Sequence, residues 1–300
     1  MTTHRTRMPS EATGTPRKPV LRTALGILAS ATATHGTGRD GDIPLPRLPG
    51  FVESAFSPLA YDVARQCLTG HPGDGARTAV ALASLTGDTT TADLASRRMV
   101  SGRVHNPLLF MQATPNSVLG HISKEFGIIG QMLSLSGIED PVAELLSMAG
   151  LLLEDPELDR VLALGVELGG SERLARVHRE LAADDGRPVP ALPPSAGLAA
   201  AVLLGRPGTG APVRVGSAED RTDVASGTGA PAAARHHGSI QGLFDLAAAH
   251  RLLLRDGGSH LLPAEPPAGH EPAAFVLTTH PDAPGHALPG SNETEIHAHQ

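Results

Sequence analysis

Apolar residues along this chain change between helical spacing and short continuous runs. They recur every three or four positions in three segments, Leu59–Leu68, Val142–Leu153 and Ser171–Ala183, which predicts helices there. Uninterrupted apolar runs at Thr78–Ser84 and Val161–Val166 predict buried strands. Chains that alternate strands with helices in this way form layered α/β domains. The pattern therefore predicts an α/β fold.

Four further segments carry a weaker version of the same pattern. Residues 20–33 form an apolar stretch that fits either a strand or a short helix. Gly197–Leu204 fits a buried strand, Ser239–Arg255 an amphipathic helix, and Ala274–Thr278 a strand. Together with the first five segments, they extend the α/β pattern over most of the chain.

Composition divides the chain into parts. Residues 1–19 are basic and rich in Thr, Arg and Pro, which predicts a disordered arm. Residues 20–183 hold most of the predicted helices and strands and form the main α/β domain. Residues 184–280 form a second part, with a Gly-, Pro- and Ala-rich linker at about 205–235. Residues 281–300, rich in His, Pro and Gly, are predicted to be a disordered tail.

The composition excludes several classes of protein. With 2% aromatic residues and no Trp, the core must be aliphatic. The single cysteine, Cys67, excludes an internal disulfide and a CxxC zinc site. A net charge of −7 argues against a nucleic-acid partner. The longest apolar runs, such as Leu151–Leu153, are too short for a membrane helix, and the first residues lack the apolar region of a secretory signal. We therefore expect a cytoplasmic protein with no membrane partner.

Common catalytic and nucleotide-binding motifs are missing from the sequence. It contains no GxSxG, HExxH or GxxxxGK[ST] motif, and no strand-borne GxGxxG. The glycine-rich stretch Gly205–Gly210 lacks the phosphate-binding lysine and is interpreted as linker. Four histidines of the tail do not fix a coordination geometry, so they do not predict a metal site; they are His280, His286, His297 and His299. We expect no metal and no cofactor.

One pattern in the sequence is specific. From Asn116 to Gly130 the chain reads N-x-x-x-G-H-I-S-x-E-x-G-x-x-G, and DRVLALGVE follows at Asp159–Glu167. The residues of the first motif are Asn116, Gly120, His121, Ile122, Ser123, Glu125, Gly127 and Gly130. Both motifs, at this spacing, resemble those of the elongating β-ketoacyl-acyl-carrier-protein synthases, members of the thiolase-like condensing enzymes. The resemblance implies a thiolase-like layered α-β-α fold, with a largely complete N-terminal half and a truncated C-terminal half.

The chain departs from this family at the nucleophile. Counted from Gly130, the position of the family's cysteine falls on Glu139. A carboxylate does not exchange thioesters as a thiolate at a helix N-terminus does. Cys67 lies far upstream in an amphipathic run and is expected to be a small buried residue. The simplest interpretation of Glu139 and Asp140 is that they cap a helix that begins at Pro141.

The paired catalytic histidines of the family are also missing. The loop that supplies the first of them is absent from the sequence. His236 and His237 precede the last predicted helix, but they lie too close to its start to match the second. We interpret them as capping or solvent-facing residues.

The resemblance therefore implies a partner subunit rather than an enzyme. Cysteine-less relatives such as chain-length factors pair with an active ketosynthase in type II fatty acid or polyene-type polyketide elongation and help to set chain length. Acyl-carrier protein would meet this chain only through that complex. The implied dimer seam spans Pro107–His121, where we expect a strand with an exposed edge. Its expected side chains are Phe110, Gln112, Pro115, Asn116, Gly120 and His121.

Two alternative functions remain open from the sequence. The first is an independent acyl-processing enzyme, a malonyl decarboxylase or an acyltransferase, with Glu139 as its acid–base residue. That role requires an apolar pocket that raises the pKa of Glu139. The second alternative is a free-standing module that binds acyl-carrier protein.

Overall fold

The structure of the protein is a computed structural model. It describes residues 21–102, 108–136, 140–170, 172–185, 192–208, 210–218, 238–263 and 274–279. The predicted arm at 1–19, the predicted tail at 281–300, Glu139, His236 and His237 lie outside these residues.

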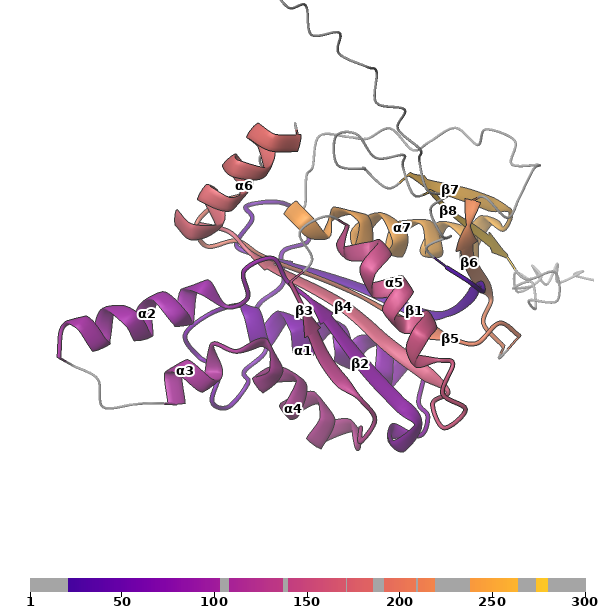
Figure 1. The fold of residues 1–300 in the computed structure, drawn as a ribbon, viewed down its shortest axis with the longest axis horizontal. Helices are drawn as coiled ribbons and strands as arrows, with labels where there is room; N and C mark the ends of the chain where they lie inside the picture. The colour runs from indigo at the N-terminus through magenta and orange to yellow at the C-terminus, as the bar shows by residue number, and fades with distance from the viewer. Residues whose placement is uncertain are drawn as a thin grey trace, which may run out of the picture.

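The described residues form one eight-stranded sheet in the order β3-β2-β4-β5-β1-β6-β8-β7 (Figure 1). The strands are β1 (Leu25–His35), β2 (Thr78–Ala83), β3 (Met132–Leu135), β4 (Arg160–Leu168), β5 (Gly197–Gly205), β6 (Val213–Ser217), β7 (Ser259–Pro263) and β8 (Ala274–Thr279). Strands β2, β3 and β4 are parallel, and β5 is antiparallel to both β4 and β1.

Helices lie on both faces of this sheet. They are α1 (Phe56–Gly70), α2 (Thr89–Val100), α3 (Leu108–Gln112), α4 (Pro115–Phe126), α5 (Pro141–Leu152), α6 (Glu172–Asp185) and α7 (Gln241–Asp256). Short 3-10 turns, η1 (Gly75–Arg77) and η3 (Gly238–Ile240), precede β2 and α7. The predicted helices correspond to α1, α5, α6 and α7, which confirms them.

The central strands are buried on both faces, which is why they were recognisable as continuous apolar runs. Every residue of β2, β4 and β5 is buried. Residues 20–33, which fitted a strand or a helix, contribute most of β1. Its neighbour β5 is built from Gly, Ala, Val and Leu, so helices can approach the sheet closely.

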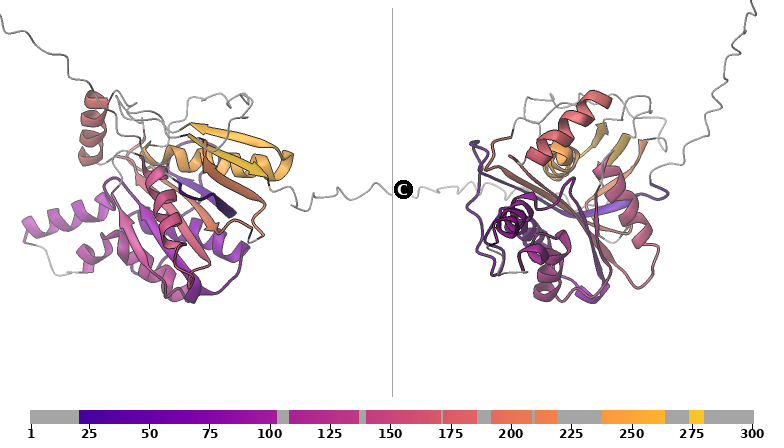
Figure 2. Two further views of the ribbon diagram at one scale, coloured as in Figure 1. Left: turned by 45° about the vertical axis from the view of Figure 1, so that its right-hand side comes forward. Right: turned by 60° about the vertical axis from the view of Figure 1, so that its left-hand side comes forward.

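The layers are arranged as in a thiolase-like fold. One core lies between the sheet and the pair α1 and α4, and a second lies between the sheet and the pair α5 and α7. These pairs are on opposite sides of the sheet in the right-hand view of Figure 2. Helix α7 contacts β1 and β5 on one side and β7 and β8 on the other. The sheet therefore continues around α7 through its last three strands.

Two expectations from the sequence were wrong. The segment Pro107–His121, expected to form a strand, is helical in its described part, where α3 and the first turns of α4 lie. The reason is local, because Pro115 occupies the first turn of α4 and Val118, Leu119 and Ile122 recur at helical spacing. Strand β6 lies inside the predicted linker at 205–235, paired with both β1 and β8.

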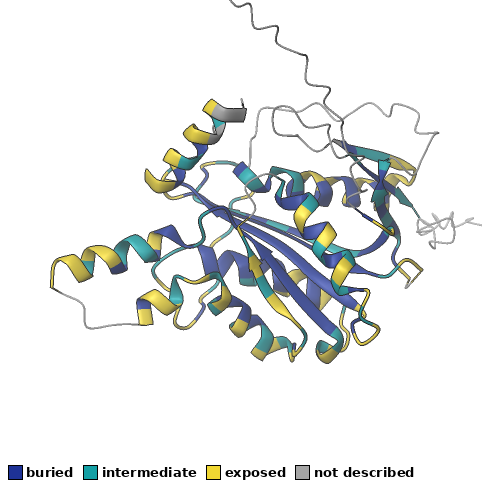
Figure 3. Cartoon of the chain, viewed as in Figure 1, coloured by how far each residue is buried: buried dark blue, intermediate teal, exposed yellow. Residues whose placement is uncertain are grey.

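Burial differs sharply between the elements. Strands β2, β4 and β5 are dark blue in Figure 3, whereas α6 is mostly yellow and α2 is yellow toward its C-terminal end. None of the helices in the described part of the chain is both long and apolar enough to cross a bilayer.

Candidate functional site

Three elements from distant parts of the sequence meet at the carboxyl end of β4. The turn η3 contacts both β4 and α5. A β-carbon on Gly165 of β4 would lie 2.6 Å from Leu243 Cδ1 and 2.8 Å from Ile240 Cγ2. Glycine at this position therefore allows the start of α7 to lie directly on the strand.

A buried carboxylate occupies the junction. Glu167, near the end of β4, is 2% exposed. One of its oxygens accepts hydrogen bonds from the Ser239 backbone N–H at 2.6 Å and from the Ser239 hydroxyl at 2.5 Å. The other lies 2.7 Å from Nε2 of His178 on α6. Three hydrogen bonds compensate the burial of the charge.

The backbone of Gly238 also lies against this carboxylate. Gly238 has a φ of +65°, and a β-carbon there would overlap the Glu167 carboxyl group. Glu167, the glutamate of the motif DRVLALGVE, thus fixes the position of η3 relative to β4. His236 and His237 immediately precede this point but lie outside the described residues.

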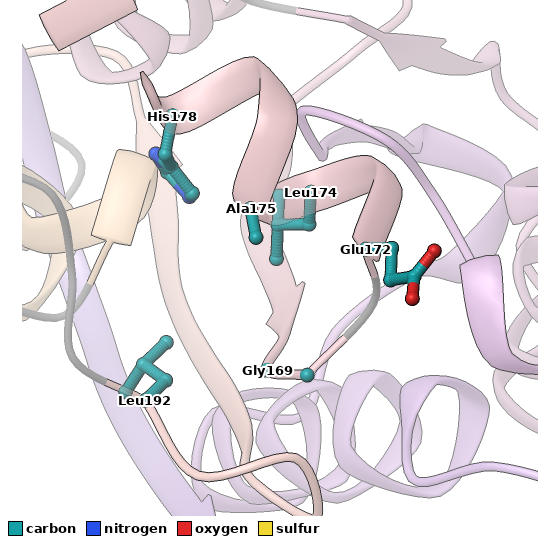
Figure 4. A pocket seen from close by; sticks show the side chains of 7 residues that line it. Gly169, Glu172, Leu174, Ala175, His178 and Leu192 are labelled. Carbon is teal, nitrogen blue, oxygen red and sulfur yellow. The ribbon is translucent and has the colours of Figure 1, made fainter.

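His178 forms one wall of a small cavity of about 200 Å³ beside α6. The cavity is lined by Gly169, Gly170, Glu172, Leu174, Ala175, His178 and Leu192. Figure 4 shows Leu192 across the cavity from the side chains of α6. The sequence analysis missed His178, although it lies one turn after Leu174 on the apolar side of a predicted helix. That spacing is the available signal for a buried histidine.

The N-terminus of α5 is closed by its own cap. Asp140 Oδ1 accepts hydrogen bonds from the backbone N–H groups of Val142, at 3.1 Å, and Ala143, at 3.0 Å. Pro141 follows at the first helical position. The capping role expected for Asp140 is therefore confirmed. Glu139, at the position of the family's nucleophile, lies outside the described residues, so its expected role stays untested.

Cys67 lies in the other core and cannot substitute for the missing nucleophile. It is 1% exposed on α1, and its thiol contacts the carbonyl oxygen of Ala201 at 3.8 Å. Burial raises the pKa of the Cys67 thiol to about 12. A thiol that stays protonated at neutral pH is a poor nucleophile.

The residues predicted for the dimer seam fall on two helices. Phe110 and Gln112 lie on α3, with Phe110 38% exposed. Pro115 begins α4, and Asn116 and Gly120 are exposed one turn apart on that helix.

His121 lies on a different side of α4 from Asn116 and Gly120. Its ring packs edge-on against Phe51, with ring centroids 6.2 Å apart, and Tyr61, at 5.5 Å. Tyr61 donates a hydrogen bond to Glu125 at 2.5 Å. These contacts connect α4 to α1, so they give His121 a packing role within this chain.

Strand β3 forms one edge of the sheet, and among the described residues it pairs with β2 alone. Gln131 and Leu135 accept hydrogen bonds from β2, at Val80 N and Ser84 N. Because residues alternate along a parallel ladder, the backbone groups of Met132 and Ser134 point to the open side. Sequence reasoning missed this four-residue strand, whose only signal is the alternation in Met-Leu-Ser-Leu.

Several exposed apolar side chains lie at the end of α2 and on α3, and we call them the apolar patch. The patch comprises Met99 and Val100 at the end of α2, and Leu108, Phe110 and Met111 on α3. Val100 is 91% exposed and Met111 64% exposed. Helix α3 contacts α2 and α4, and α4 contacts β3. In Figure 1, α2 and α3 project from the body of the molecule.

The described residues contain no group of three His, Cys, Asp or Glu side chains placed to hold a metal ion. His178 and Glu167 form a hydrogen-bonded pair, and no third described side chain of these types joins them to complete a metal site.

Comparison with solved structures identifies the architecture. A chain of the ketosynthase ApeO complexed with its chain length factor ApeC, from Xenorhabdus doucetiae, matches with a TM-score of 0.52, 16% identity, and coverage of 86% of this chain and 100% of that chain. The chain has a ketosynthase-like fold. A chain of the ishigamide ketosynthase/chain length factor matches with a TM-score of 0.58 at 16% identity, and covers 86% of this chain and 99% of that one. Protein-family models and curated proteins gave no match.

The resemblance inferred from the sequence is confirmed at the level of the ketosynthase-like fold. Both matches extend over nearly the whole of the other chain and over 86% of this one, so the similarity spans most of each chain. Within that fold, the site contains a capped helix and a hydrogen-bonded carboxylate.

Proposed function

We propose that this chain is a non-catalytic, ketosynthase-like subunit that pairs with an active β-ketoacyl synthase and helps to set chain length. Its pathway would be type II fatty acid or polyene-type polyketide elongation. The observation that carries the proposal is the open edge of β3 together with the apolar patch, within a ketosynthase-like fold. The solved structures that share this fold belong to complexes of a ketosynthase with a chain length factor.

The first turn of α5 and the burial of Cys67 support a non-catalytic role. In thiol catalysis, the N–H groups at a helix N-terminus stabilise a thiolate. At α5, the carboxylate of Asp140 already accepts hydrogen bonds from two of these groups. Cys67 is buried in the opposite core. The first turn of α5 is thus arranged for capping.

The open edge of β3 supports a protein partner. An unpaired strand edge satisfies its remaining backbone groups by pairing with another strand or with water. Here the N–H and C=O groups of Met132 and Ser134 face outward. Pairing at this edge would continue the sheet into the partner, in addition to the contacts expected at Pro107–His121.

The exposed side chains of the apolar patch also support a protein partner. Five large apolar side chains within 13 residues of sequence are exposed on α2 and α3. Exposed apolar side chains gathered in one place mark protein–protein interfaces more often than scattered ones do. Acyl-carrier protein would then reach this chain through the complex with the synthase.

Gly120 adds a separate argument for a close neighbour. It lies in the middle of α4, is exposed, and would place a β-carbon in open space. Glycine inside a helix costs about 1 kcal/mol relative to alanine. Since nothing in the described part of the chain requires its small size, we infer that a partner element approaches α4 closely at Gly120 and Asn116.

Co-expression with a β-ketoacyl synthase encoded beside this gene tests the proposal. Size-exclusion chromatography should show a stoichiometric heterodimer. Ser134→Pro removes one outward N–H without affecting the ladder to β2, and should abolish pairing. Phe110→Glu places a charge in the patch and should also abolish it.

Leu254→Glu is the matched control, because Leu254 is a similarly exposed residue on α7. It should pair as the parent chain does. A monomer or homodimer that does not bind the synthase would reject the proposal and favour an independent enzyme or carrier-binding module.

If the heterodimer forms, Phe110→Trp tests the control of chain length. It should change the product lengths of the complex, whereas Leu254→Trp should not.

A further inference from the structure

We propose that the cavity beside His178 binds a short aliphatic chain that ends in a hydroxyl group, which donates its proton to Nδ1 of His178. This site lies between α6 and Leu192, apart from the β3 edge and the apolar patch. The proposal does not depend on the proposed function, and the isolated chain can test it.

Glu167 contacts the ring of His178 on its Nε2 side. A carboxylate only accepts hydrogen bonds, so the 2.7 Å contact with Glu167 requires that Nε2 of His178 carries the proton. In the neutral ring, Nδ1 then presents a lone pair. No described residue donates a hydrogen bond to it, although the side chain is only 10% exposed. The pair therefore offers one oriented acceptor to a ligand that carries a donor.

The walls of the cavity select for an uncharged aliphatic body. Leu174, Ala175 and Leu192 supply apolar surface, and Gly169 and Gly170 supply backbone. The cavity has one carboxylate among its lining residues, that of Glu172, and the carboxylate of Glu167 lies behind His178. Two negative charges oppose a carboxylate or a phosphate in the cavity. A neutral hydroxyl meets the acceptor without that repulsion.

Close backbone contacts hold the walls of the cavity in place. The backbone N–H of Gly169 donates to the carbonyl of Ala196 at 2.7 Å. β-Carbons on Gly169 or Gly170 would overlap the backbone of Pro193 or Pro194, so glycine is required for this close approach. With a volume of about 200 Å³, the cavity is smaller than the roughly 300 Å³ minimum of pockets for drug-sized molecules. A chain of about four carbons is therefore the appropriate probe.

Nuclear magnetic resonance of the full chain with isotopically labelled histidine tests the site. The His178 ring signal is identified by its loss in His178→Gln. Butan-1-ol should shift this signal saturably, whereas its methyl ether, which lacks the donor, and butanoate, which is anionic, should not. No saturable shift with butan-1-ol, or an equal shift with the ether, would overturn the proposal.

A second variant leaves the hydrogen-bonded pair intact. Leu192→Phe fills the cavity from the opposite wall and should reduce the affinity for butan-1-ol at least tenfold. Leu252→Phe, on the exposed side of α7, is the matched control and should bind as the parent chain does. Unchanged binding by Leu192→Phe would place the alcohol elsewhere and reject this cavity as the site.

Discussion

Ser239 donates two hydrogen bonds to a single carboxylate oxygen of Glu167, from its backbone N–H at 2.6 Å and from its hydroxyl at 2.5 Å. The two residues are 72 positions apart, one near the end of β4 and the other in η3 before α7. The second oxygen of Glu167 contacts His178 on α6. One buried carboxylate thus connects the two halves of the chain and the otherwise exposed helix α6.

Replacing this carboxylate should destabilise the whole fold. Glu167→Ala leaves His178 and the Ser239 N–H without their buried partner, which costs about 3 kcal/mol or more. Chemical denaturation measures the loss in the free energy of unfolding. Glu157→Ala, at an exposed position, is the control and should change it by less than about 0.5 kcal/mol. A loss below about 1 kcal/mol for Glu167→Ala would show that the cluster contributes little.

Gly238 should tolerate alanine much less well than Gly127 does. Both have a φ near +65°, so each substitution introduces backbone strain of about 1 kcal/mol. A β-carbon meets the Glu167 carboxyl group at position 238 and open space at position 127. Thermal and chemical denaturation should therefore show a clearly larger loss for Gly238→Ala. Equal losses would mean that the contact with Glu167 relaxes at no cost.

Gly120→Ala should stabilise the isolated chain. The added methyl group meets no atom of the chain, and alanine favours the helix by about 1 kcal/mol. The same change should weaken pairing with the synthase, because it fills the space assigned to the partner. Denaturation of the isolated chain and titration with the synthase measure the two effects. If pairing is unaffected, no close contact exists at Gly120.

Stability should fall as acid protonates His250. This residue of α7 is 2% exposed, and its Nδ1 lies 2.8 Å from the Ser30 hydroxyl. Burial lowers the pKa of His250 to about 4, and the nearby charge of Arg251 contributes less to the shift. The unfolded chain takes up a proton near pH 6.5, and the folded chain does so only near pH 4. The stabilisation is thus complete above pH 6.5 and is lost as the pH falls toward 4. By linkage it amounts to about 3 kcal/mol.

Denaturation curves of the parent chain and His250→Gln at several pH values between 7.5 and 4 measure this effect. The free energy of unfolding should fall more steeply for the parent chain, since other groups titrate equally in both. Parallel pH profiles would contradict a buried neutral His250.

Glu139→Ala should leave turnover by the complex with the synthase nearly unchanged. We expect Glu139 to help cap α5 rather than to react. Product formation by the purified complex measures this directly. Abolished turnover in an intact complex would show that Glu139 has a chemical role and that this subunit takes part in catalysis.

The sequence by itself determined the elements that are buried on both sides. Strands β2, β4 and β5 were recognisable because every residue in them is buried, and α1, α5 and α7 because one side of each packs on the sheet. The cap at Asp140 was also predictable, since it depends only on the next three residues. The family motifs pointed to the right fold.

Only the tertiary structure decided where the surfaces and the junction lie. Strand β3 has four residues and is stabilised by pairing with β2, so local sequence indicates it poorly, and an edge strand was expected at Pro107–His121 instead. The meeting of Glu167 with Ser239 and His178 depends on how β4, α6 and η3 pack. Hydrophobic periodicity reports burial along one element, whereas contacts between distant elements depend on the packing of the whole chain.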